Sequence, residues 1–566
     1  NASGISTVAT IGAEAMEAGI RTVTFVDVGA ATDSLTVAAA FTADLTVNLD
    51  ATNVNTVAAS AYTGALTVAT TAEILNDATM VLTGGTGTDT LSITADAGAA
   101  ATVSSITDIE NITVVGDAGA FNWTGVDANA DDGSTITVDA TSLATGTYAA
   151  TIDMTLEADA SVVVKGGAGA DAITISASDL AESVTAGAGA DTINFASANL
   201  TSIDVIDGGA GTDTMKVSDD VAIVDADFTN VTNVETLSST GTGISTIVTL
   251  GAEAMGAGIA TVNLIDTGAA TDSVTVGAGF TSALAIDLDG GSVVNTVNAT
   301  NYTGALTVTA TIAEMASAVM VLTGGSGSDT LTVDLATADN LVAADLATIT
   351  NFETFKTTDD NVTTLTLSEA NVTAGNTLTV NATSMLTTVL TFSGAAETSG
   401  SIDLSVAGTG DHVVTSLGNG NDTFTSTGTG AITVSAALAG NNTITTGSGV
   451  DGITGGTGDD TISSGSGIDT ITFASSNFTS GDTINAGDGV DIISMTGDST
   501  VIDSDFTNVT NLETLTAAGV DELSATLGAS AMAAGIVNVT LTGTATGDDD
   551  AITLDSGYST GSVTVT

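Results

Sequence analysis

The amino-acid sequence predicts an all-β fold in which short strands form coils that stack into a solenoid. Two observations carry this prediction. Nine-residue units recur in unbroken register, and elsewhere short strand-like segments alternate with tight, glycine-rich turns. A fixed sequence period is the signature of a repeat architecture, in which each unit packs only against its neighbours. Nothing between the strand-like segments has the periodicity of a long amphipathic helix.

The clearest register lies in residues 437–472, which contain the units ALAGNNTIT, TGSGVDGIT, GGTGDDTIS and SGSGIDTIT. Glycine occupies the fourth position of every unit and isoleucine the eighth, while the sixth is Asn442, Asp451, Asp460 and Asp469 in turn. Glycine lets the backbone turn through positive φ, and the residues after the sixth position form a short strand with one inward apolar side chain. A flexible Gly/Asp-rich linker is the alternative interpretation, but it does not explain an isoleucine at every ninth residue.

Two nine-residue units make one predicted coil of about 18 residues, so units two apart stack on the same edge of the solenoid. Asp451 is then expected above Asp469, and Asn442 above Asp460. Calcium takes six to eight hard oxygen ligands in a forgiving geometry, and aspartate supplies such oxygens. Each turn is expected to provide half of a calcium site and its stacked neighbour the other half. Asp451 and Asp469 should share a site, and the asparagine makes the other pair the weaker one.

The unit GGTGDDTIS at residues 455–463 resembles the nonapeptide GGxGxDxUx of the repeats-in-toxin (RTX) family, in which U is a large apolar residue. The resemblance implies a parallel β-helix or β-roll solenoid with calcium in the Gly/Asp-rich turns. It also implies a bacterial protein that is exported and is either surface-bound or released. Gly456, Gly458, Gly465 and Gly467 are included among the metal-site residues, because glycines leave their carbonyl groups free to point inward.

Sixth-position carboxylates elsewhere in the chain are further candidate calcium ligands. Residues 166–216 hold a first cluster of units, and residues 417–425 (LGNGNDTFT) lead into the main array. The isolated units at residues 84–92 and 324–332 each supply only half a site, so a capping aspartate in a glycine-rich turn explains them equally well. The candidates outside the main array are Asp89, Asp171, Asp191, Asp204, Asp213, Asp329, Asp422, Asp482 and Asp491.

The composition favours a cation that neutralises acidic side chains on folding. The 67 acidic residues face only four basic ones, which gives a formal net charge of −63 at pH 7. Hydrophobic residues nevertheless make up 43% of the chain, unlike an acidic disordered segment. Like charges at this density repel one another, and a divalent cation relieves that repulsion. The same charge argues against binding to nucleic acids, which requires a basic surface.

Catalysis has little support in the sequence. There is no cysteine and a single histidine, His412, so histidine-based triads and zinc sites are all but excluded. We predict that His412 is a surface or turn residue. Carboxylate pairs of the kind that glycosidases use are abundant, but they recur at a structural period within glycine turns. We therefore expect no enzymatic activity. No run of about 18 apolar residues is present, so the sequence predicts no membrane span.

Long repeats organise the rest of the chain. Residues 4–37 recur as residues 243–276, and a diverged copy begins near Val520. Their Gly-Ala-Glu-Ala-Met piece is expected to form one short helical turn. Thr-Asn-apolar-Glu elements, which contain Glu235 and Glu513, are expected to be coil strands with the glutamate facing outward, although a role as ligands stays open. The first residues enter a repeat part-way through, so we expect a processed or excised part of a longer protein.

The repeats predict five segments. These are a first solenoid repeat (1–160), a first nonapeptide cluster (161–217), a second solenoid repeat with an insert (218–416), a second nonapeptide cluster (417–495) and the start of a third repeat (496–566).

The acidic, Thr/Ala-rich, cysteine-free composition with scattered nonapeptide clusters is most similar to that of calcium-dependent surface-layer proteins of Gram-negative bacteria. This resemblance implies a secreted structural protein at the bacterial cell surface. Its expected cofactor is Ca²⁺, and its expected partners are copies of itself and cell-surface polysaccharide. The repetitive stalk of a large calcium-dependent RTX adhesin is the alternative. Ice binding through flat threonine ranks is disfavoured, because the Thr-x-Thr pieces drift in spacing.

Overall fold

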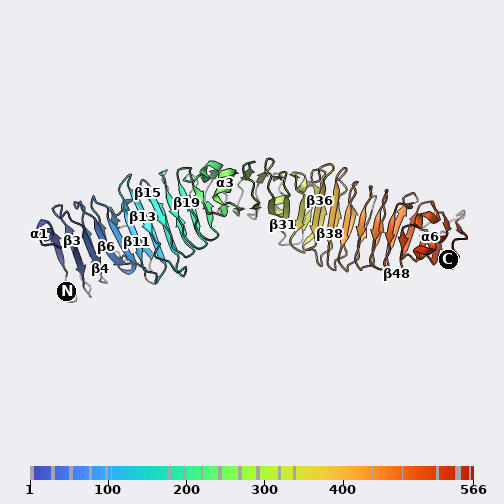
Figure 1. Ribbon diagram of the computed structural model, residues 1–566, viewed down its shortest axis with the longest axis horizontal. Helices are drawn as coiled ribbons and strands as arrows, with labels where there is room; N and C mark the ends of the chain where they lie inside the picture. The colour runs from blue at the N-terminus through green and yellow to red at the C-terminus, as the bar shows by residue number, and fades with distance from the viewer. Residues whose placement is uncertain are drawn as a thin grey trace. The chain divides into compact units, whose positions relative to one another are not determined.

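The described part of the chain is an all-β, parallel β-solenoid, which confirms the predicted fold class (Figure 1). The chain divides into two compact units, Asn1–Leu284 and Ala285–Thr566, which we name unit 1 and unit 2. The five sequence segments stay a prediction. Residues 437 and 438 of the main array, and Val520, lie outside the described residues. The computed structural model describes residues 6–26, 32–49, 55–75, 80–95, 100–102, 105–175, 180–195, 199–217, 221–239, 245–265, 271–288, 294–316, 320–334, 339–435, 439–474, 476–517, 522–541, 550–559 and 562–566.

In unit 1, each strand inside a sheet pairs in parallel with the equivalent strands one coil before and one coil after it (Figure 1). One sheet contains β1 (Val8–Ile11), β3 (Asp33–Val37), β5 (Asn55–Ala58), β7 (Val81–Thr83) and β10 (Ile106–Thr107). A second contains β2 (Thr22–Phe25), β4 (Leu45–Leu49), β6 (Leu66–Thr71), β8 (Thr90–Thr94), β11 (Asn111–Val115), β13 (Thr135–Asp139), β15 (Ser161–Lys165), β17 (Ser183–Thr185), β19 (Val205–Asp207) and β22 (Val231–Thr232). A third contains β9 (Ala100–Thr102), β12 (Phe121–Val126), β14 (Ala150–Leu156), β16 (Ala172–Thr174), β18 (Thr192–Phe195), β20 (Thr214–Val217), β23 (Thr236–Ser239) and β25 (Thr261–Leu264), and a fourth contains β21 (Val221–Ile223), β24 (Thr246–Leu250) and β26 (Thr271–Val276).

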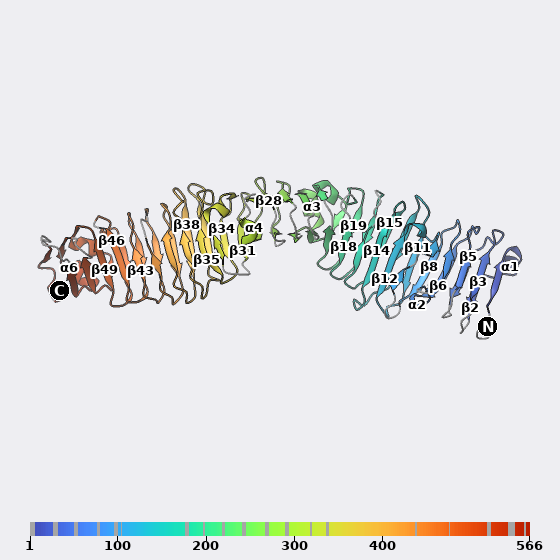
Figure 2. The same cartoon turned by 180° about the vertical axis from the view of Figure 1, so that it is seen from behind.

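Unit 2 repeats this arrangement, as Figure 2 shows from the opposite side; β27 (Leu284–Asp287) contains the boundary residue between the units. One sheet contains β29 (Leu306–Thr311), β31 (Thr330–Asp334), β34 (Thr354–Thr357), β36 (Thr377–Ala382), β38 (Ser401–Val406), β40 (Thr423–Ser426), β42 (Thr443–Thr445), β44 (Thr461–Ser463), β47 (Thr483–Asn485) and β51 (Val509–Thr510). A second contains β32 (Asp339–Leu341), β35 (Val362–Thr366), β37 (Thr391–Ser393), β39 (Val413–Ser416), β41 (Thr433–Val434), β43 (Gly452–Thr454), β46 (Thr470–Ala474), β49 (Ile492–Thr496), β52 (Thr514–Ala517), β54 (Asn538–Leu541) and β56 (Thr564–Val565). Smaller sheets contain β28 (Val294–Asn298), β30 (Val321–Thr323) and β33 (Ile349–Thr350); β45 (Ser466–Gly467) and β48 (Asp488–Gly489); and β50 (Ser499–Val501), β53 (Leu523–Leu527) and β55 (Ala551–Leu554).

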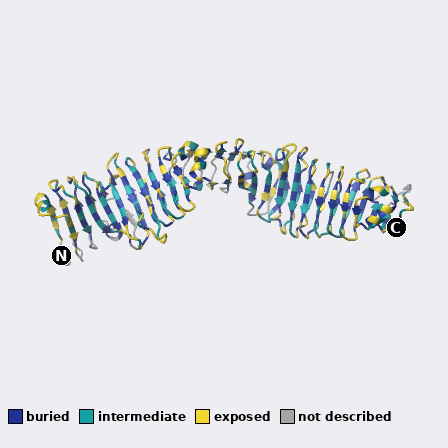
Figure 3. Ribbon diagram, viewed as in Figure 1, coloured by how far each residue is buried: buried dark blue, intermediate teal, exposed yellow. Residues whose placement is uncertain are grey.

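The strand register confirms that two nonapeptides complete one coil in the main array. Thr443 of β42 pairs with Thr461 of β44, and on the other edge Gly452 of β43 pairs with Thr470 of β46. Equivalent residues are therefore 18 positions apart here, whereas they are 20, 22 or 26 apart in other coils. The core is made of inward side chains stacked at one position of successive strands, and buried and partly exposed residues alternate along many of the strands, such as β46 (Figure 3). One such row in unit 2 is Phe424, Ile444, Ile462 and Ile484, each at most 1% exposed.

The Gly-Ala-Glu-Ala-Met pieces form short helices, as predicted. They are α1 (Ala13–Glu17), α3 (Ala252–Ala257) and, in the diverged copy, α6 (Ala529–Ala534). The carboxylate of Asp225 caps α3 from the preceding coil, because its Oδ1 accepts the backbone N–H groups of Gly251 and Ala254 at 2.7 and 2.9 Å. This capping explains why a near-identical Asp-x-Asp-Phe segment precedes α3 and α6. The other helical segments are α2 (Ala72–Leu75), α4 (Ile312–Met315), α5 (Ala343–Leu346), η1 (Asp127–Asn129), η2 (Asp225–Phe228) and η3 (Asp503–Phe506).

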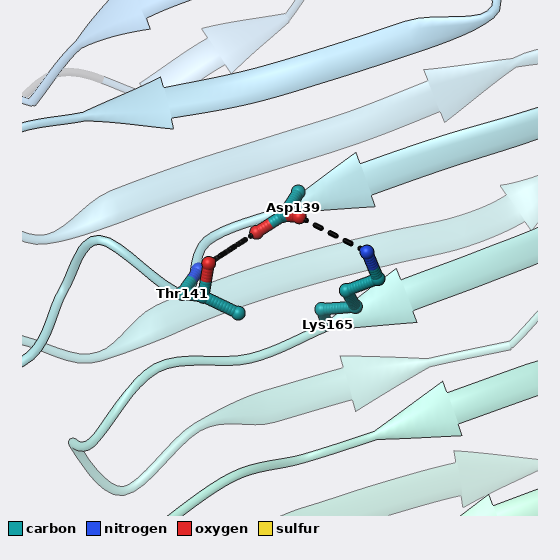
Figure 4. Close-up of polar contacts among 3 residues, drawn as sticks. All are labelled: Asp139, Thr141 and Lys165. Carbon is teal, nitrogen blue, oxygen red and sulfur yellow. Dashed lines mark hydrogen bonds and ion pairs between the residues drawn. The ribbon is translucent and has the colours of Figure 1, made fainter.

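Basic residues neutralise little of the acidic charge. Within the described residues, the ion pair that the structure forms joins Lys165 of β15 to Asp139 of β13, with 3.2 Å between Nζ and Oδ2 (Figure 4). Thr141 donates its hydroxyl to the other oxygen of Asp139 at 2.6 Å. Burial raises the pKa of Asp139, but the hydrogen bonds from Thr141 and the ion pair outweigh it and hold that pKa below its usual value. In the described ranges, no helix is both long and apolar enough to cross a bilayer.

The stacked isoleucine row should dominate the stability of the array. Ile462→Ala removes a side chain that is 1% exposed, and we expect it to lower the free energy of unfolding by about 2–5 kcal/mol. Ile468→Ala lies in the next nonapeptide but is 55% exposed, so its effect should stay within about 0.5 kcal/mol. Urea unfolding at fixed calcium concentration measures both, and equal losses for the two variants would contradict the observed register.

Candidate calcium-binding turns

The sixth-position residues all lie inside the solenoid, immediately before a strand. Each is at most 2% exposed. The residues are Asp89, Asp171, Asp191, Asp204, Asp213, Asp329, Asp422, Asn442, Asp451, Asp460, Asp469, Asp482 and Asp491. Burying an ionised carboxylate is unfavourable unless hydrogen bonds or a cation compensate for the lost water.

One oxygen of each of these side chains accepts a hydrogen bond from the preceding coil. In unit 2 the backbone N–H of Asp451 donates to Oδ1 of Asp469, and that of Asp469 to Oδ1 of Asp491, both at 2.9 Å. On the other edge the N–H of Asn442 donates to Oδ1 of Asp460, also at 2.9 Å. The expected stacking of Asp451 with Asp469 and of Asn442 with Asp460 is therefore present. We name each such column of side chains a carboxylate ladder.

Unit 1 contains a carboxylate ladder of the same kind. The N–H of Asp171 donates to Oδ1 of Asp191 at 2.7 Å, and the N–H of Asp191 to Oδ1 of Asp213 at 2.8 Å. Asp204 belongs to the opposite edge, where its Oδ1 accepts the N–H of Glu182 at 3.0 Å. The structure thus brings together the three aspartates of the glycine-rich cluster and places Asp204 apart from them.

The glutamates of the Thr-Asn-apolar-Glu elements end the ladders, so the prediction that they face outward is wrong. Oε2 of Glu235 accepts the N–H of Asp213 at 2.8 Å, and Oε2 of Glu513 accepts that of Asp491 at 2.9 Å. Strand alternation fails here because Asn233 and its counterparts adopt a left-handed conformation with φ near 54° and separate two strands. Asp108, Asn351 and Asn511 adopt the same left-handed conformation in the other copies of this element. Glu110 and Glu353 likewise accept hydrogen bonds, from the backbone N–H groups of Asp89 at 2.6 Å and of Asp329 at 2.7 Å. The recurrence of this element in the sequence was the signal for these residues.

His412 also takes a ladder position, so it is a turn residue but is buried rather than on the surface. It is 2% exposed and lies directly before β39. Its Nδ1 accepts the N–H of Leu390 at 3.2 Å, and its Nε2 lies 3.0 Å from the carbonyl oxygen of Ala407. A neutral imidazole with its proton on Nε2 satisfies both contacts. The ring therefore replaces a carboxylate as the acceptor from the preceding coil.

The second carboxylate oxygen divides the turns into two kinds. In closed turns, a backbone N–H of the same turn donates to Oδ2, as Gly167 does to Asp171 at 2.6 Å and Gly456 does to Asp460 at 3.0 Å. In open turns, Oδ2 is buried and has no hydrogen-bond partner. The closed turns hold Asp89, Asp171, Asp204, Asp329, Asp460 and Asp482. The open turns hold Asp191, Asp213, Asp422, Asp451, Asp469 and Asp491.

The conformation of one glycine separates most open turns from closed ones. Four residues before the aspartate, Gly187, Gly209, Gly418, Gly465 and Gly487 have φ between 90° and 111°. The glycines at that place in the closed nonapeptide turns, among them Gly456, are not left-handed and aim their N–H at Oδ2. Asp451 is an exception, since its turn is open without such a glycine.

Stacked open turns pack too closely for any side chain. A Cβ on Gly465 would lie 1.8 Å from the carbonyl oxygen of Gly447, and one on Gly487 would lie 1.7 Å from that of Gly465. Gly458 and Gly467 also have positive φ, at 118° and 154°. Of the four glycines predicted to belong to metal sites, Gly465 and Gly467 thus line an open turn, while Gly456 and Gly458 belong to a closed one.

The open turns fit a hard divalent cation. Their unpartnered oxygens are carboxylate oxygens, which calcium prefers. The nearby hydroxyls of Thr446 and Ser464 donate instead to carbonyl groups of the next coil, both at 2.7 Å. In closed turns, including the isolated turns of Asp89 and Asp329, the capping hydrogen bond already satisfies Oδ2. The sequence does not separate the two kinds: four of the closed turns begin with a Gly-Gly pair, but so does the open turn of Asp213.

Burial raises the pKa of two ladder aspartates, Asp191 and Asp422, well above the usual value. For Asp191, burial and the neighbouring charges of Asp171 and Asp213 raise the pKa to about 6. For Asp422, burial and the charge of Glu397 also raise it to about 6. These shifts mean that the ionised form is disfavoured in the fold when no cation is present.

The shifts predict a pH dependence of the metal-free protein. Because the folded pKa of Asp191 and Asp422 exceeds the unfolded value, their contribution to stability is complete below about pH 4 and is lost as pH rises through about pH 6. Under chelation, the free energy of unfolding should therefore fall across this range. The double variant Asp191→Asn/Asp422→Asn keeps the acceptor oxygens and should gain roughly 2 kcal/mol per site at neutral pH. Thermal or urea unfolding at several pH values measures this, and an unchanged pH slope in the variant would contradict the assignment.

Comparison with known proteins agrees with this geometry. The family model of the RTX calcium-binding nonapeptide repeat (4 copies) matches residues 201–217 and 437–471. The first match contains Asp204 and Asp213, and the second contains the main array up to Asp469. No curated protein and no solved structure matches the chain significantly. The chain is therefore a parallel β-solenoid that carries RTX calcium-binding repeats in these two stretches, and the repeats imply that it binds Ca²⁺.

Proposed function

We propose that this chain is a structural, extracellular bacterial protein whose calcium-bound turns hold the solenoid coils together, and that it self-assembles into a surface layer, sheath or fibre. The observation that carries the proposal is the set of buried carboxylate oxygens without partners in the open turns. Each belongs to a ladder that links successive coils, so a cation there stabilises stacking rather than a local loop.

The open turns define which residues would hold the ions. In unit 2 these are Asp422 on one edge and Asp451, Asp469 and Asp491 on the other. Bound calcium supplies positive charge that offsets the burial of these carboxylates. In its absence, the raised pKa values of Asp191 and Asp422 and the net charge of −63 both oppose folding at neutral pH.

Coupling of folding to calcium suits an exported protein. RTX repeat proteins are typically secreted. At the low calcium concentration of the cytoplasm, charge repulsion would keep the chain unfolded and ready for export. Outside, at about millimolar calcium, sites with dissociation constants of about 10⁻⁴–10⁻³ M would fill and drive folding.

Two surface features support self-assembly. Acidic side chains far outnumber the basic ones, so calcium can bridge the acidic faces of neighbouring copies. In unit 2, Val450, Ile468 and Val490 are 65%, 55% and 52% exposed and directly precede three stacked ladder aspartates. They form an exposed apolar row across successive coils, a feature common at contacts between proteins.

Removing ladder charge should weaken calcium binding. In Asp469→Asn/Asp491→Asn, the amide oxygens still accept the N–H groups of the preceding coil, but the cation ligands lose their charge. We expect fewer bound ions by equilibrium dialysis and a far-UV circular dichroism transition shifted about tenfold or more toward higher calcium. The control Asp459→Asn removes an exposed carboxylate of the same array and should leave both readouts unchanged. Equal behaviour of the two variants would count against calcium in these turns.

Electron microscopy of purified protein with and without calcium tests the assembly. The proposal predicts two-dimensional or helical order that appears with calcium and disappears on chelation. Isolated rods that need calcium to fold but never associate would favour the adhesin stalk instead. Particle size and circular dichroism that do not respond to chelation would overturn both interpretations.

A further inference from the structure

A second kind of acidic site lies in unit 1, outside the nonapeptide turns. It joins η1, which begins at Asp127, to the turn between β14 and β15, which contains Glu157 and Asp159. One carboxylate oxygen of each residue can be chosen so that all of them lie within 4.8 Å of one another. We propose that Asp127, Glu157 and Asp159 form a divalent-cation site of the calcium type that fastens these two neighbouring coils.

Hydrogen bonds to backbone groups hold the two coils of the cluster in place. Asn129 is fully buried; its Oδ1 accepts the N–H of Val126 at 2.7 Å and its Nδ2 donates to the carbonyl of Ile106 at 2.8 Å, which fixes η1. The N–H of Gly133 donates to the carbonyl of Asp159 at 2.9 Å and ties η1's coil to the next turn. The three carboxylates are thus brought together by the fold itself.

Glu157 is the observation that points to a ligand. Its side chain is 0% exposed, and while Oε1 accepts the N–H of Ala160 at 3.1 Å, Oε2 is buried without a partner. Oδ1 of Asp159 is buried and unpartnered as well. A bound cation satisfies both oxygens at once, whereas without it three carboxylates face one another. Asp127 is exposed and gives the ion access from solvent.

The equivalent position in unit 2 has the residues that fix the turn but not the same carboxylates. There Asn371 fixes the turn in the same way, since its Oδ1 accepts the N–H of Ser368 at 2.7 Å and its Nδ2 donates to the carbonyl of Ile349 at 2.9 Å. Glu397 is fully buried, its Oε1 accepts the N–H of Ser399 at 2.7 Å, and its Oε2 is buried without a partner, as in Glu157. A buried turn-capping glutamate is therefore common to both units.

The two positions differ in the remaining carboxylates. Ser399 takes the place of Asp159 of unit 1, and Glu369 takes the place of Asp127. The carboxylate of Glu369 accepts the hydroxyl of Thr398 at 2.7 Å. Within the described residues, it is the unit 1 position that gathers three carboxylates. Asp159 is thus the residue that converts a structural turn into a site, and serine is a replacement that the fold accommodates.

The test compares wild-type protein with Asp159→Ser, which copies the unit 2 arrangement. The probe is Tb³⁺, a calcium substitute whose emission is excited through a nearby tryptophan. Trp123, the single tryptophan of the chain, lies on β12, which ends beside Asp127. We expect tryptophan-sensitised emission in the wild type that calcium competes away, and affinity for Tb³⁺ weakened roughly tenfold or more in Asp159→Ser. Equilibrium dialysis should show one calcium ion fewer per chain.

Control variants separate this site from the nonapeptide turns. Asp153→Asn removes a carboxylate from β14 without touching the cluster, and Asp459→Asn removes an exposed carboxylate of the nonapeptide array in unit 2; both should retain the sensitised emission. Asp127→Asn, at an exposed position, provides a second variant should Asp159→Ser fold poorly, and it should also weaken emission. Wild-type protein without calcium-competed emission, or an Asp159→Ser variant with undiminished emission and ion count, would overturn the proposal.

Discussion

The hydrogen bond from a backbone N–H to a buried carboxylate one coil later is the interaction on which this structure depends. It fixes how each turn stacks on the turn of the next coil, and it places the following strand in register with its neighbour, as for Asp451 and Asp469. A charged acceptor makes such a bond stronger than a neutral one. The same bond also leaves the other carboxylate oxygen to be satisfied separately, either by the turn's own glycine or by a cation.

These two ways of satisfying the second carboxylate oxygen explain how so acidic a chain can have a packed interior. In closed turns such as that of Asp460, both carboxylate oxygens accept backbone hydrogen bonds, so the side chain acts as a structural cap. Open turns such as that of Asp491 bury an oxygen without a partner, and we propose that a cation satisfies it. On this proposal the isoleucine rows supply the remaining stability, and calcium promotes the stacking of the coils. Folding and ion binding are then one event rather than two.

The periodic part of the structure could be predicted from the sequence, whereas its departures from periodicity could not. The nine-residue register was enough to place Ile444 over Ile462 and Asn442 over Asp460, because glycine, carboxylate and apolar positions leave one way to stack the coils. The prediction for Glu235 fails because strand alternation does not continue across Asn233, whose left-handed conformation separates two strands. The sequence did not place His412 in the interior because its ring accepts a backbone N–H of the preceding coil where other coils use a carboxylate. The cluster of Asp127 and Glu157 depends on coils of unequal length, which no fixed period encodes.

We propose that cations occupy the open turns and not the closed ones. Anomalous diffraction from crystals grown with calcium, or with a lanthanide in its place, tests this directly, because it locates each ion independently of the protein chain. We expect peaks beside the unpartnered Oδ2 atoms of Asp451, Asp469 and Asp491 and none beside the capped oxygen of Asp89. Peaks that ignore this division, or open turns whose oxygens are hydrogen-bonded only to water, would contradict it.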